Sequence, residues 1–448
     1  MKRAFFLAFS TFCVVLAPSA ARAGGIRKGP WTQRVTPHSA VVRIEVDPPA
    51  PVTLELGMMG PPGTTDSGIG SVIESREVRA LHSILVQNLE PATRYPFTVR
   101  VSGAQRYGAL TTAPAEDSGT TFRFLIYGDT RSDDTAHASV VRAMEVARSD
   151  FVVYTGDLVE NGASPSQWQA FFDIEAPITR ERPIFATVGN HELTDGAGMQ
   201  FVRYFGSADV PAGDTLTLDQ LSGTFRWANT RFFLINGMVN YSSGAMRAWL
   251  DKVLTDSDTE PGLVWRIVVV HHGLWSSGPH GNNPLLHEAK LPELLRAHKV
   301  DLVISGHDHI YERGFAEGLA YLVSGGGGAP VYRVKKAQPT SRRYESVRHF
   351  IEASVSGVGI NFVATRTDTS IIEQCALRKG AGWDCDGEKS EIDASPPTAA
   401  TAATPSSGSK CGCRAVGDSG DSSSGVACVL MAIGAAAIAA RSRRRFVR

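Results

Sequence analysis

The feature that most constrains the fold of this chain is a strand-like apolar run that ends in a polar loop, repeated five times. The runs span residues 122–127, 151–154, 183–187, 265–270 and 300–304, and the polar residues that follow them include Asp129, Asp157, Asn190, His271 and His307. Helical patterns at 136–147 and 291–298 alternate with these runs, which indicates an α/β domain. Because the loops that follow such strands share one edge of a sheet, we expect all five polar loops to meet there.

The residue types in these loops are those of a metal site. One Gly-Asp after a strand is more often a turn than a ligand. Five such loops in order supply two Asp, one Asn and several His, which are ligands for hard or borderline metal ions. The sequence therefore predicts a metal centre built from segments that lie far apart in the chain.

Residues 25–113 have a different pattern, in which apolar and polar residues alternate in short runs such as 40–46 and 97–101. Alternation of this kind, between Pro- and Gly-rich turns, predicts an all-β unit the size of a sandwich domain. The segment 89–95, LEPATRY, matches the tyrosine-corner pattern, so this unit resembles a fibronectin type III domain. We place the domain at 24–114 and expect it to have a structural role beside a catalytic domain.

The order of the polar motifs, D…GD…GNHE…H…GHxH, resembles that of calcineurin-like metallophosphoesterases. The segments 306–313, GHDHIYER, and 321–330, YLVSGGGGAP, together with the preceding β domain, look most like the purple acid phosphatase branch of that family. The resemblance covers residues 25–370. It implies an α/β (α+β) domain at 121–372, a metallophosphoesterase β-sandwich flanked by helices, and an enzyme that hydrolyses phosphate esters.

The resemblance also implies a role for each polar loop. It implies two divalent or trivalent metal ions, Fe, Mn or Zn, bridged by Asp157. The remaining ligands would be Asn190, His271 and His307 at one ion and Asp129 and His309 at the other. Such a pair of ions ionises a trapped water near neutral pH, and the hydroxide attacks phosphorus. His191 would be the acid that protonates the leaving group.

Two positions depart from the family pattern. Most of the superfamily has Asp-x-His at the first motif, where this chain has Arg131. Purple acid phosphatases instead place a Tyr, the source of their colour, three residues after the bridging Asp, where this chain has Glu160. Both familiar ligands of the first metal are therefore replaced, and we expect this metal to be held loosely.

Each replacement leaves two interpretations open. Glu160 either binds the metal or pairs with His191 and keeps that histidine protonated and oriented, which is the interpretation that we favour. Arg131 either faces the phosphate oxygens, for which its fork of N–H groups is suited, or forms a salt bridge with Asp133 or Asp134. The candidate catalytic residues are therefore His191, Glu160 and Arg131.

Metal-dependent hydrolysis of phosphate esters is the leading hypothesis. The alternatives are a ligand-binding envelope protein whose first metal site is vacant, and a protein whose β domain is the functional half. The intact pair of Asn190 and His191 favours catalysis, because a binding protein has no need of a leaving-group acid. The 45 basic and 45 acidic residues cancel, so charge alone gives no reason to expect a nucleic-acid partner.

The N-terminal end predicts export. Residues 1–3 contain a Lys-Arg pair, residues 4–16 are apolar, and residues 21–23 form a small-x-small motif, which together indicate a signal peptide at 1–23. The alternative is an N-terminal anchor, but the apolar run is short for a membrane span.

The C-terminal end predicts attachment to the cell surface. A small extension, a flexible linker and a transmembrane or sorting tail with an arginine cluster follow in order, at 373–394, 395–424 and 425–448. With Cys411 and Cys413, this end resembles the MYXO-CTERM class of surface-sorting signals, and the alternative is a single-pass anchor. We therefore expect an exported protein at the cell envelope. In such a protein Cys375 and Cys385 are expected to form a disulfide.

Overall fold

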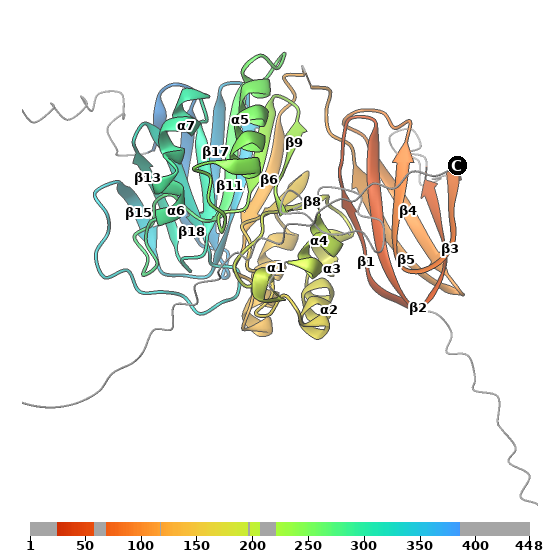
Figure 1. Cartoon of the computed structure of the whole chain (residues 1–448). Coiled ribbons are helices and arrows are strands. Elements are labelled where there is room, and N and C mark those ends of the chain that lie inside the picture. Colours follow the sequence, from red (N-terminus) through yellow and green to blue (C-terminus); the bar gives the residue numbers. More distant parts are fainter. Residues whose placement is uncertain (1–24, 58–68, 117, 196–197, 207–220, 386–448) are drawn as a thin grey trace, which may run out of the picture. The chain divides into compact units, whose positions relative to one another are not determined.

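A computed structural model describes residues 25–57, 69–116, 118–195, 198–206 and 221–385 (Figure 1). The predicted signal peptide, linker and sorting tail lie outside these residues and stay predictions. Within the described part of the chain, no helix is both long and apolar enough to cross a membrane.

Residues 25–57 and 69–111 form an antiparallel β region, in agreement with the alternating pattern. Val42, Ile44 and Val46 of β2 (Ser39–Gly57) are buried in one apolar cluster because every second side chain of a strand points to the same side. The Tyr95 hydroxyl accepts a hydrogen bond from the main-chain N–H of Glu90 at 2.8 Å, as in a tyrosine corner, while the likeness to fibronectin type III stays a prediction. The strands are β1 (Gly25–Gln33), β2 (Ser39–Gly57), β3 (Ile69–Gln87), β4 (Arg94–Val101) and β5 (Ala104–Thr111).

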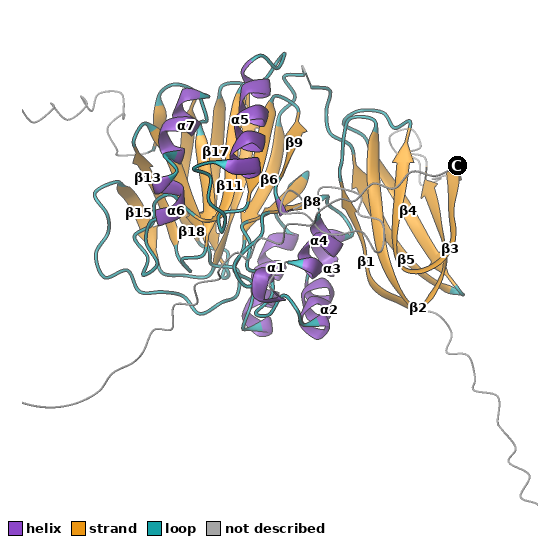
Figure 2. Ribbon diagram, in the orientation of Figure 1, coloured by secondary structure: helices purple, strands orange, loops and turns teal. Residues whose placement is uncertain are grey.

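Residues 122–384 contain two seven-stranded sheets that pack face to face (Figure 2). One sheet has the order β19-β18-β17-β16-β6-β7-β8, and its strands are β6 (Phe122–Tyr127), β7 (Phe151–Tyr154), β8 (Ile184–Ala186), β16 (His349–Ser356), β17 (Gly359–Arg366), β18 (Ile371–Arg378) and β19 (Gly382–Asp384). The other has the order β15-β13-β14-β12-β11-β10-β9, and its strands are β9 (Gly223–Trp227), β10 (Thr230–Ile235), β11 (Trp265–His272), β12 (Leu302–Gly306), β13 (Tyr311–Ala316), β14 (Leu319–Ser324) and β15 (Ser341–Glu345).

Within each sheet the strands that carry the polar loops run parallel to one another, and they are buried on both faces. β6, β7 and β8 are parallel in one sheet, and β10, β11 and β12 are parallel in the other. In β6, Phe124 and Ile126 join the apolar cluster between the sheets, whereas Leu125 and Tyr127 pack in a second cluster with residues of the helices. This explains why these runs are apolar throughout, since parallel strands are covered on both sides.

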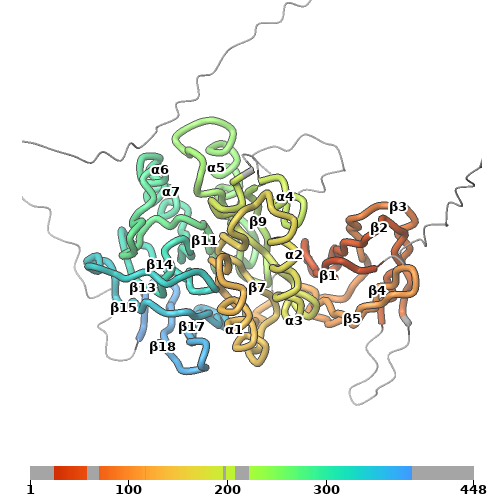
Figure 3. The backbone as a smooth tube through the Cα atoms, turned by 90° about the horizontal axis from the view of Figure 1, so that it is seen from below, coloured from red at the N-terminus to blue at the C-terminus, as the bar shows by residue number. Residues whose placement is uncertain are grey.

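Helices cover the two outer faces, which gives four layers in the order helix, sheet, sheet, helix. α1, α2 and α3 lie close to β7, whereas α5, α6 and α7 lie on the other sheet (Figures 1 and 3). The helices are α1 (Asp134–Glu145), α2 (Pro165–Ile174), α3 (Ala176–Thr179), α4 (Met199–Phe205), α5 (Gly244–Asp258), α6 (Pro284–Glu288) and α7 (Leu291–Ala297), with a 3-10 turn at Glu192–Asp195.

This architecture confirms the predicted fold class, a β-sandwich flanked by helices and preceded by an all-β region. The helical patterns at 136–147 and 291–298 correspond to α1 and α7. The predicted disulfide between Cys375 and Cys385 is present. The prediction that all five polar loops share the edge of one sheet is wrong, because β6, β7 and β8 belong to one sheet and β11 and β12 to the other.

Candidate metal centre

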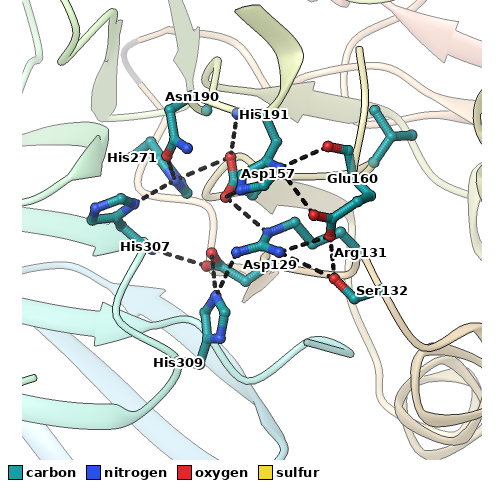
Figure 4. Close-up of polar contacts among 12 residues, drawn as sticks. Asp129, Arg131, Ser132, Asp157, Glu160, Asn190, His191, His271, His307 and His309 are labelled. Atoms are coloured by element: carbon teal, nitrogen blue, oxygen red, sulfur yellow. Dashed lines mark hydrogen bonds and ion pairs between the residues drawn. The ribbon is translucent and has the colours of Figure 1, made fainter. Parts of the chain in front are cut away.

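The predicted site residues meet where strands of the two facing sheets end (Figure 4). On one sheet Asp129, Asp157 and Asn190 follow β6, β7 and β8. From the facing sheet, His271 lies near the end of β11 and His307 follows β12. The sandwich therefore brings together side chains that are up to 178 residues apart, as in the hydrogen bond from the His307 N–H to Asp129 Oδ2 at 3.0 Å.

Four residues form what we call the histidine site: Asp157, Asn190, His271 and His307. Nε2 of His271 lies 3.2 Å from each of three atoms, Oδ1 of Asp157, Oδ1 of Asn190 and Nδ1 of His307. On the other side of the ring, Nδ1 of His271 lies 2.8 Å from the main-chain oxygen of Thr155 and can donate to it. That hydrogen bond leaves the lone pair of Nε2 free for a metal, the arrangement typical of metal-binding histidines.

The histidine site favours a positive charge. Burial lowers the pKa of His271, but the carboxylates of Asp157 and Asp129 raise it by more, to about 9. Four donor atoms, oxygen and nitrogen, converge on one point from three loops and a strand. Such a mixed set suits Fe, Mn or Zn, and the residues present therefore fit a metal ion.

Three residues form what we call the Asp129 site: Asp129, Asp157 and His309. Nε2 of His309 lies 3.5 Å from Oδ1 of Asp129, and its Nδ1 lies 2.7 Å from the main-chain oxygen of Pro330. Oδ1 of Asp129 is buried and has no hydrogen-bond partner within the described part of the chain. The ligands predicted for the first metal are thus also brought together.

The guanidinium of Arg131 lies among the ligands of the Asp129 site (Figure 4). Its Nε donates to Oδ2 of Asp157 at 3.1 Å, and its Nη2 lies 3.4 Å from Nε2 of His309. Its Nη1 donates to Oε2 of Glu160 at 2.7 Å and to the hydroxyl of Ser132 at 3.1 Å. These four contacts, all with side chains of the protein, fix the position of the guanidinium.

The salt bridge considered for Arg131 with Asp133 or Asp134 is not what the structure shows. Among the described residues, the ion pairs of Arg131 are with Asp157 and Glu160. Asp133 instead accepts a hydrogen bond from the N–H of Ala136 at the start of α1 and pairs with Arg348 at 3.2 Å. Capping a helix start is the more favourable use of this carboxylate, since it satisfies a free N–H group.

His191 is oriented by the main chain of Glu160. Nδ1 of His191 lies 2.7 Å from the carbonyl oxygen of Glu160, whereas the carboxylate of Glu160 is 3.6 Å from the same nitrogen. The favoured interpretation, in which the Glu160 carboxylate pairs with the histidine, is met by this longer ion-pair contact, and the carbonyl of the same residue makes the shorter one. Nε2 of His191 faces Oδ2 of Asp157 at 3.8 Å, and one fifth of the side chain is exposed.

The backbone is strained where it presents these side chains. Asp129, Asp157 and His307 have φ angles of 57°, 53° and 68°, in the left-handed region that side chains disfavour. A Cβ on Gly189 would lie 2.1 Å from Oδ1 of Asp157, and one on Gly306 would lie 2.4 Å from Oδ2 of Asp129. The glycines of the motifs are therefore required by close approach, and strain of this kind gathers at functional sites.

The structure assigns a positioning role to Glu192, which the sequence motif contained but whose role was not predicted. Its buried carboxylate accepts hydrogen bonds from the main-chain N–H groups of Asp157 at 2.9 Å, Leu158 at 2.8 Å, Val159 at 3.3 Å and Gly189 at 2.8 Å. Burial and the nearby Asp157 carboxylate raise its pKa. Glu192 therefore ties the loop after β7 to the loop after β8.

Two aromatic side chains line the open side of the centre. The ring of Tyr332 stacks on that of His309 with centroids 4.0 Å apart, and the ring of His280 lies 4.3 Å from that of His307. Neither residue was predicted to lie at the centre, and His280 is exposed. The ring of His272 also lies 4.3 Å from that of His307, while its Nε2 lies 3.2 Å from the carbonyl oxygen of Gly281, so His272 packs against a ligand of the histidine site.

Comparison with known proteins agrees with this geometry. Residues 122–311 match the family model of calcineurin-like phosphoesterases. The fold and the site thus define this part of the chain as a calcineurin-like metallophosphoesterase domain. The chain is also similar to purple acid phosphatases over part of its length: it is 28% identical to purple acid phosphatase 3 of Arabidopsis thaliana over 240 residues, which cover 48% of this chain and 65% of that protein.

Other relatives extend the comparison. An uncharacterised protein of Mycobacterium tuberculosis is 28% identical over 300 residues, 56% of either chain, so the match spans about half the length of that relative. The structure of purple acid phosphatase PPD1 from yellow lupin (Lupinus luteus) seeds superposes with a TM-score of 0.65 at 18% identity, covering 78% of this chain and 74% of that chain. PhoD superposes with a TM-score of 0.62 at 12% identity, covering 80% and 91%. These superpositions show a shared fold.

Proteins of this family use a dinuclear metal centre. The histidine site of this chain fits one of the two ions, because its four donor atoms converge without a competing cation. The Asp129 site fits less well, because the guanidinium of Arg131 contacts two of its three ligands.

Proposed function

We propose that this protein hydrolyses phosphate esters with a metal ion in the histidine site and with His191 as the general acid. The observation that carries the proposal is the convergence of three donor atoms on Nε2 of His271, each at 3.2 Å, beside the imidazole of His191. A metal ion at this point would act as a Lewis acid for the phosphoryl group and ionise a water.

His191 is placed to move the proton that the leaving group needs. Because Nδ1 is bound to the carbonyl of Glu160, Nε2 is the atom that delivers the proton. This atom faces Asp157, a ligand of the histidine site, and the side chain is partly exposed, so a bound ester can reach it. Protonation of the leaving oxygen at the moment of bond breaking is the main contribution of the acid.

Asp157 and Glu192 hold the geometry of the acid and the ligands together. Oδ1 of Asp157 accepts the main-chain N–H of His191 at 3.0 Å while it faces Nε2 of His271 at 3.2 Å. Glu192 fixes the backbone of Asp157 and of Gly189. One rigid unit therefore carries both the acid and the ligands, which limits the reorganisation that the reaction requires.

The test is hydrolysis of a generic phosphate monoester and diester by the purified chain, with matched measurement of bound metal. The proposal expects turnover by the metal-loaded protein, its loss in Asn190→Ala, and its loss in His191→Ala for esters whose leaving group needs a proton. Metal binding without turnover of any ester would instead favour the ligand-binding alternative.

We further propose that the protein is exported and held at the cell envelope. The predicted signal at residues 1–23 and the predicted tail at 425–448 are the reasons, and the disulfide between Cys375 and Cys385 is in keeping with an oxidising compartment. N-terminal sequencing and cell fractionation test this. A chain that retains Met1 and stays in the cytoplasm contradicts it.

A further inference from the structure

The two replaced positions of the family pattern contact one another. Nη1 of Arg131 donates to Oε2 of Glu160 at 2.7 Å, and the Ser132 hydroxyl donates to the same oxygen. These are the positions at which relatives in the family carry a His or a Tyr that binds the first metal. In this chain both potential ligands are thus exchanged for a matched pair of opposite charges.

The guanidinium lies where an ion would have to lie. Metal bonds to carboxylate oxygen and imidazole nitrogen are about 2.0–2.2 Å long. Nε and Nη2 of Arg131 are already 3.1 Å from Oδ2 of Asp157 and 3.4 Å from Nε2 of His309. An ion at bonding distance from these two ligands would collide with the guanidinium. Arginine cannot yield by losing its proton, because the guanidinium stays charged in proteins.

Arg131 also occupies the side of Asp157 on which a second metal ion would be bridged. Its Oδ1 faces the histidine site, 3.2 Å from Nε2 of His271, and its Oδ2 accepts from Arg131. A carboxylate can bridge two metals by giving one oxygen to each of them. Here Oδ2 accepts a hydrogen bond from the guanidinium of Arg131. Asp157 therefore lies between the metal position of the histidine site and this guanidinium.

The formal charges agree with one ion. The carboxylates of Asp129, Asp157 and Glu160 bring three negative charges, and Arg131 brings one positive charge. One divalent ion in the histidine site makes this set neutral. A second divalent ion would raise the net charge of this set to plus two. It would also place two metal ions and the guanidinium around the carboxylate of Asp157.

We propose that this centre binds a single metal ion, in the histidine site, and that the guanidinium of Arg131 is a permanent cation in place of the second ion. The inference rests on the proposed function only in taking the histidine site as a metal site. The guanidinium offers a fixed positive charge and N–H donors but no Lewis acidity. The positive charge at the Asp129 site is therefore supplied by Arg131 and is present whether or not metal is available.

Metal stoichiometry of the full chain tests this proposal. The protein is loaded with excess Mn²⁺, freed of unbound ion by dialysis, and measured for Mn²⁺ per chain, with electron paramagnetic resonance to detect coupled ions. We expect one ion per chain and the spectrum of an isolated ion. Two ions per chain with an exchange-coupled spectrum in the unmodified protein would overturn the proposal.

The variants Arg131→His and Arg131→Ala make the test specific. The first restores the Asp-x-His pattern and the second empties the space, so both are expected to raise the stoichiometry towards two, with a coupled spectrum in Arg131→His. Arg348→His is the matched control, since Arg348 pairs with Asp133 outside the centre, and it should stay at one. Folded Arg131 variants that both remain at one ion would also count against the proposal.

The outcome separates this inference from the proposed function. One ion per chain in a protein that hydrolyses no ester leaves the inference standing and removes the proposed function. Two ions per chain in an active enzyme would overturn the inference and leave the proposed function standing.

Discussion

Nδ1 of His191 and the main-chain carbonyl oxygen of Glu160 lie 2.7 Å apart, which leaves only Nε2 of His191 free to face the metal ligands. The main chain of Glu160 therefore makes the shorter contact with His191, and the Glu160 carboxylate adds an ion-pair contact at 3.6 Å. Glu160 contacts two residues of the centre through different atoms. Its carbonyl oxygen binds His191, and its carboxylate binds Arg131.

The first prediction concerns the leaving group. His191→Ala should slow hydrolysis of alkyl phosphate esters by about 10²–10⁴-fold, because their leaving oxygen needs a proton. Nitrophenyl esters should suffer much less, since their leaving group is stable as an anion. Rates for a series of esters measure this dependence, with metal content as the control for an intact site. Equal losses for all esters would give His191 another role.

The second prediction concerns Glu192. Glu192→Gln replaces one acceptor oxygen by an NH₂ group, which then faces main-chain N–H groups that both oxygens now satisfy. Leaving these donors unsatisfied should reduce the free energy of unfolding by about 2 kcal/mol or more. Urea denaturation checks this. Glu74→Gln, on an exposed side chain, is the control and should change little. A Glu192→Gln protein as stable as its parent would contradict the positioning role.

The third prediction concerns a buried pair outside the metal centre. Nε2 of His137 in α1 lies 2.7 Å from Oε1 of Glu175, and the Tyr154 hydroxyl donates to Oε2 of Glu175 at 2.9 Å. Burial lowers the pKa of His137 to about 3 and raises that of Glu175 above its ordinary value of 4.5. Whichever residue carries the proton, the folded pair holds one.

The sign of the pH dependence follows from counting protons. The unfolded chain also holds one proton on these groups between their ordinary pKa values of 4.5 and 6.5. Above pH 6.5 the unfolded chain loses that proton, so stability should fall as pH rises, by up to about 1.4 kcal/mol per pH unit. Below pH 4.5 the unfolded chain gains a second proton, so stability should fall as pH falls. Glu175→Gln should remove the alkaline loss and keep the acid one, as urea midpoints from pH 4 to 8.5 would show.

The fourth prediction is that the iron-loaded protein is colourless. In purple acid phosphatases the colour comes from a tyrosine bound to iron, and this chain has Glu160 at that position. Tyr154 is buried and bonded to Glu175, and the Tyr311 hydroxyl donates to Glu373 at 2.6 Å, so neither faces the centre. Absorption spectra check this. A visible band that disappears in Tyr332→Phe would show that Tyr332 has become a ligand.

The residues of the site could be predicted from the sequence because polar loops follow five apolar strands in order. One such loop is a weak signal, so the roles of Asp129, Asp157 and His307 as ligands came from the resemblance to calcineurin-like metallophosphoesterases. That β6 and β11 belong to different sheets could not be predicted, because periodicity shows which residues are buried and not which strands pair.

The partners of Arg131 and Glu192 were beyond sequence reasoning for another reason. Arg131 contacts Glu160, 29 residues away, and His309, 178 residues away. Nothing local in the sequence favoured these partners over a salt bridge with the nearby Asp133. Glu192 binds main-chain N–H groups, which every residue has and which leave no mark in a sequence. Such roles appear only when the loops are placed side by side.

The central claim is that a metal ion in the histidine site is required for hydrolysis of phosphate esters. The most direct measurement is the rate of hydrolysis after exhaustive chelation and after addition of Mn, Zn or Fe, with metal content followed in parallel. We expect activity to vanish with the metal and to return with it, and His307→Ala to lose both metal and activity. Full activity of the metal-free protein would contradict this account.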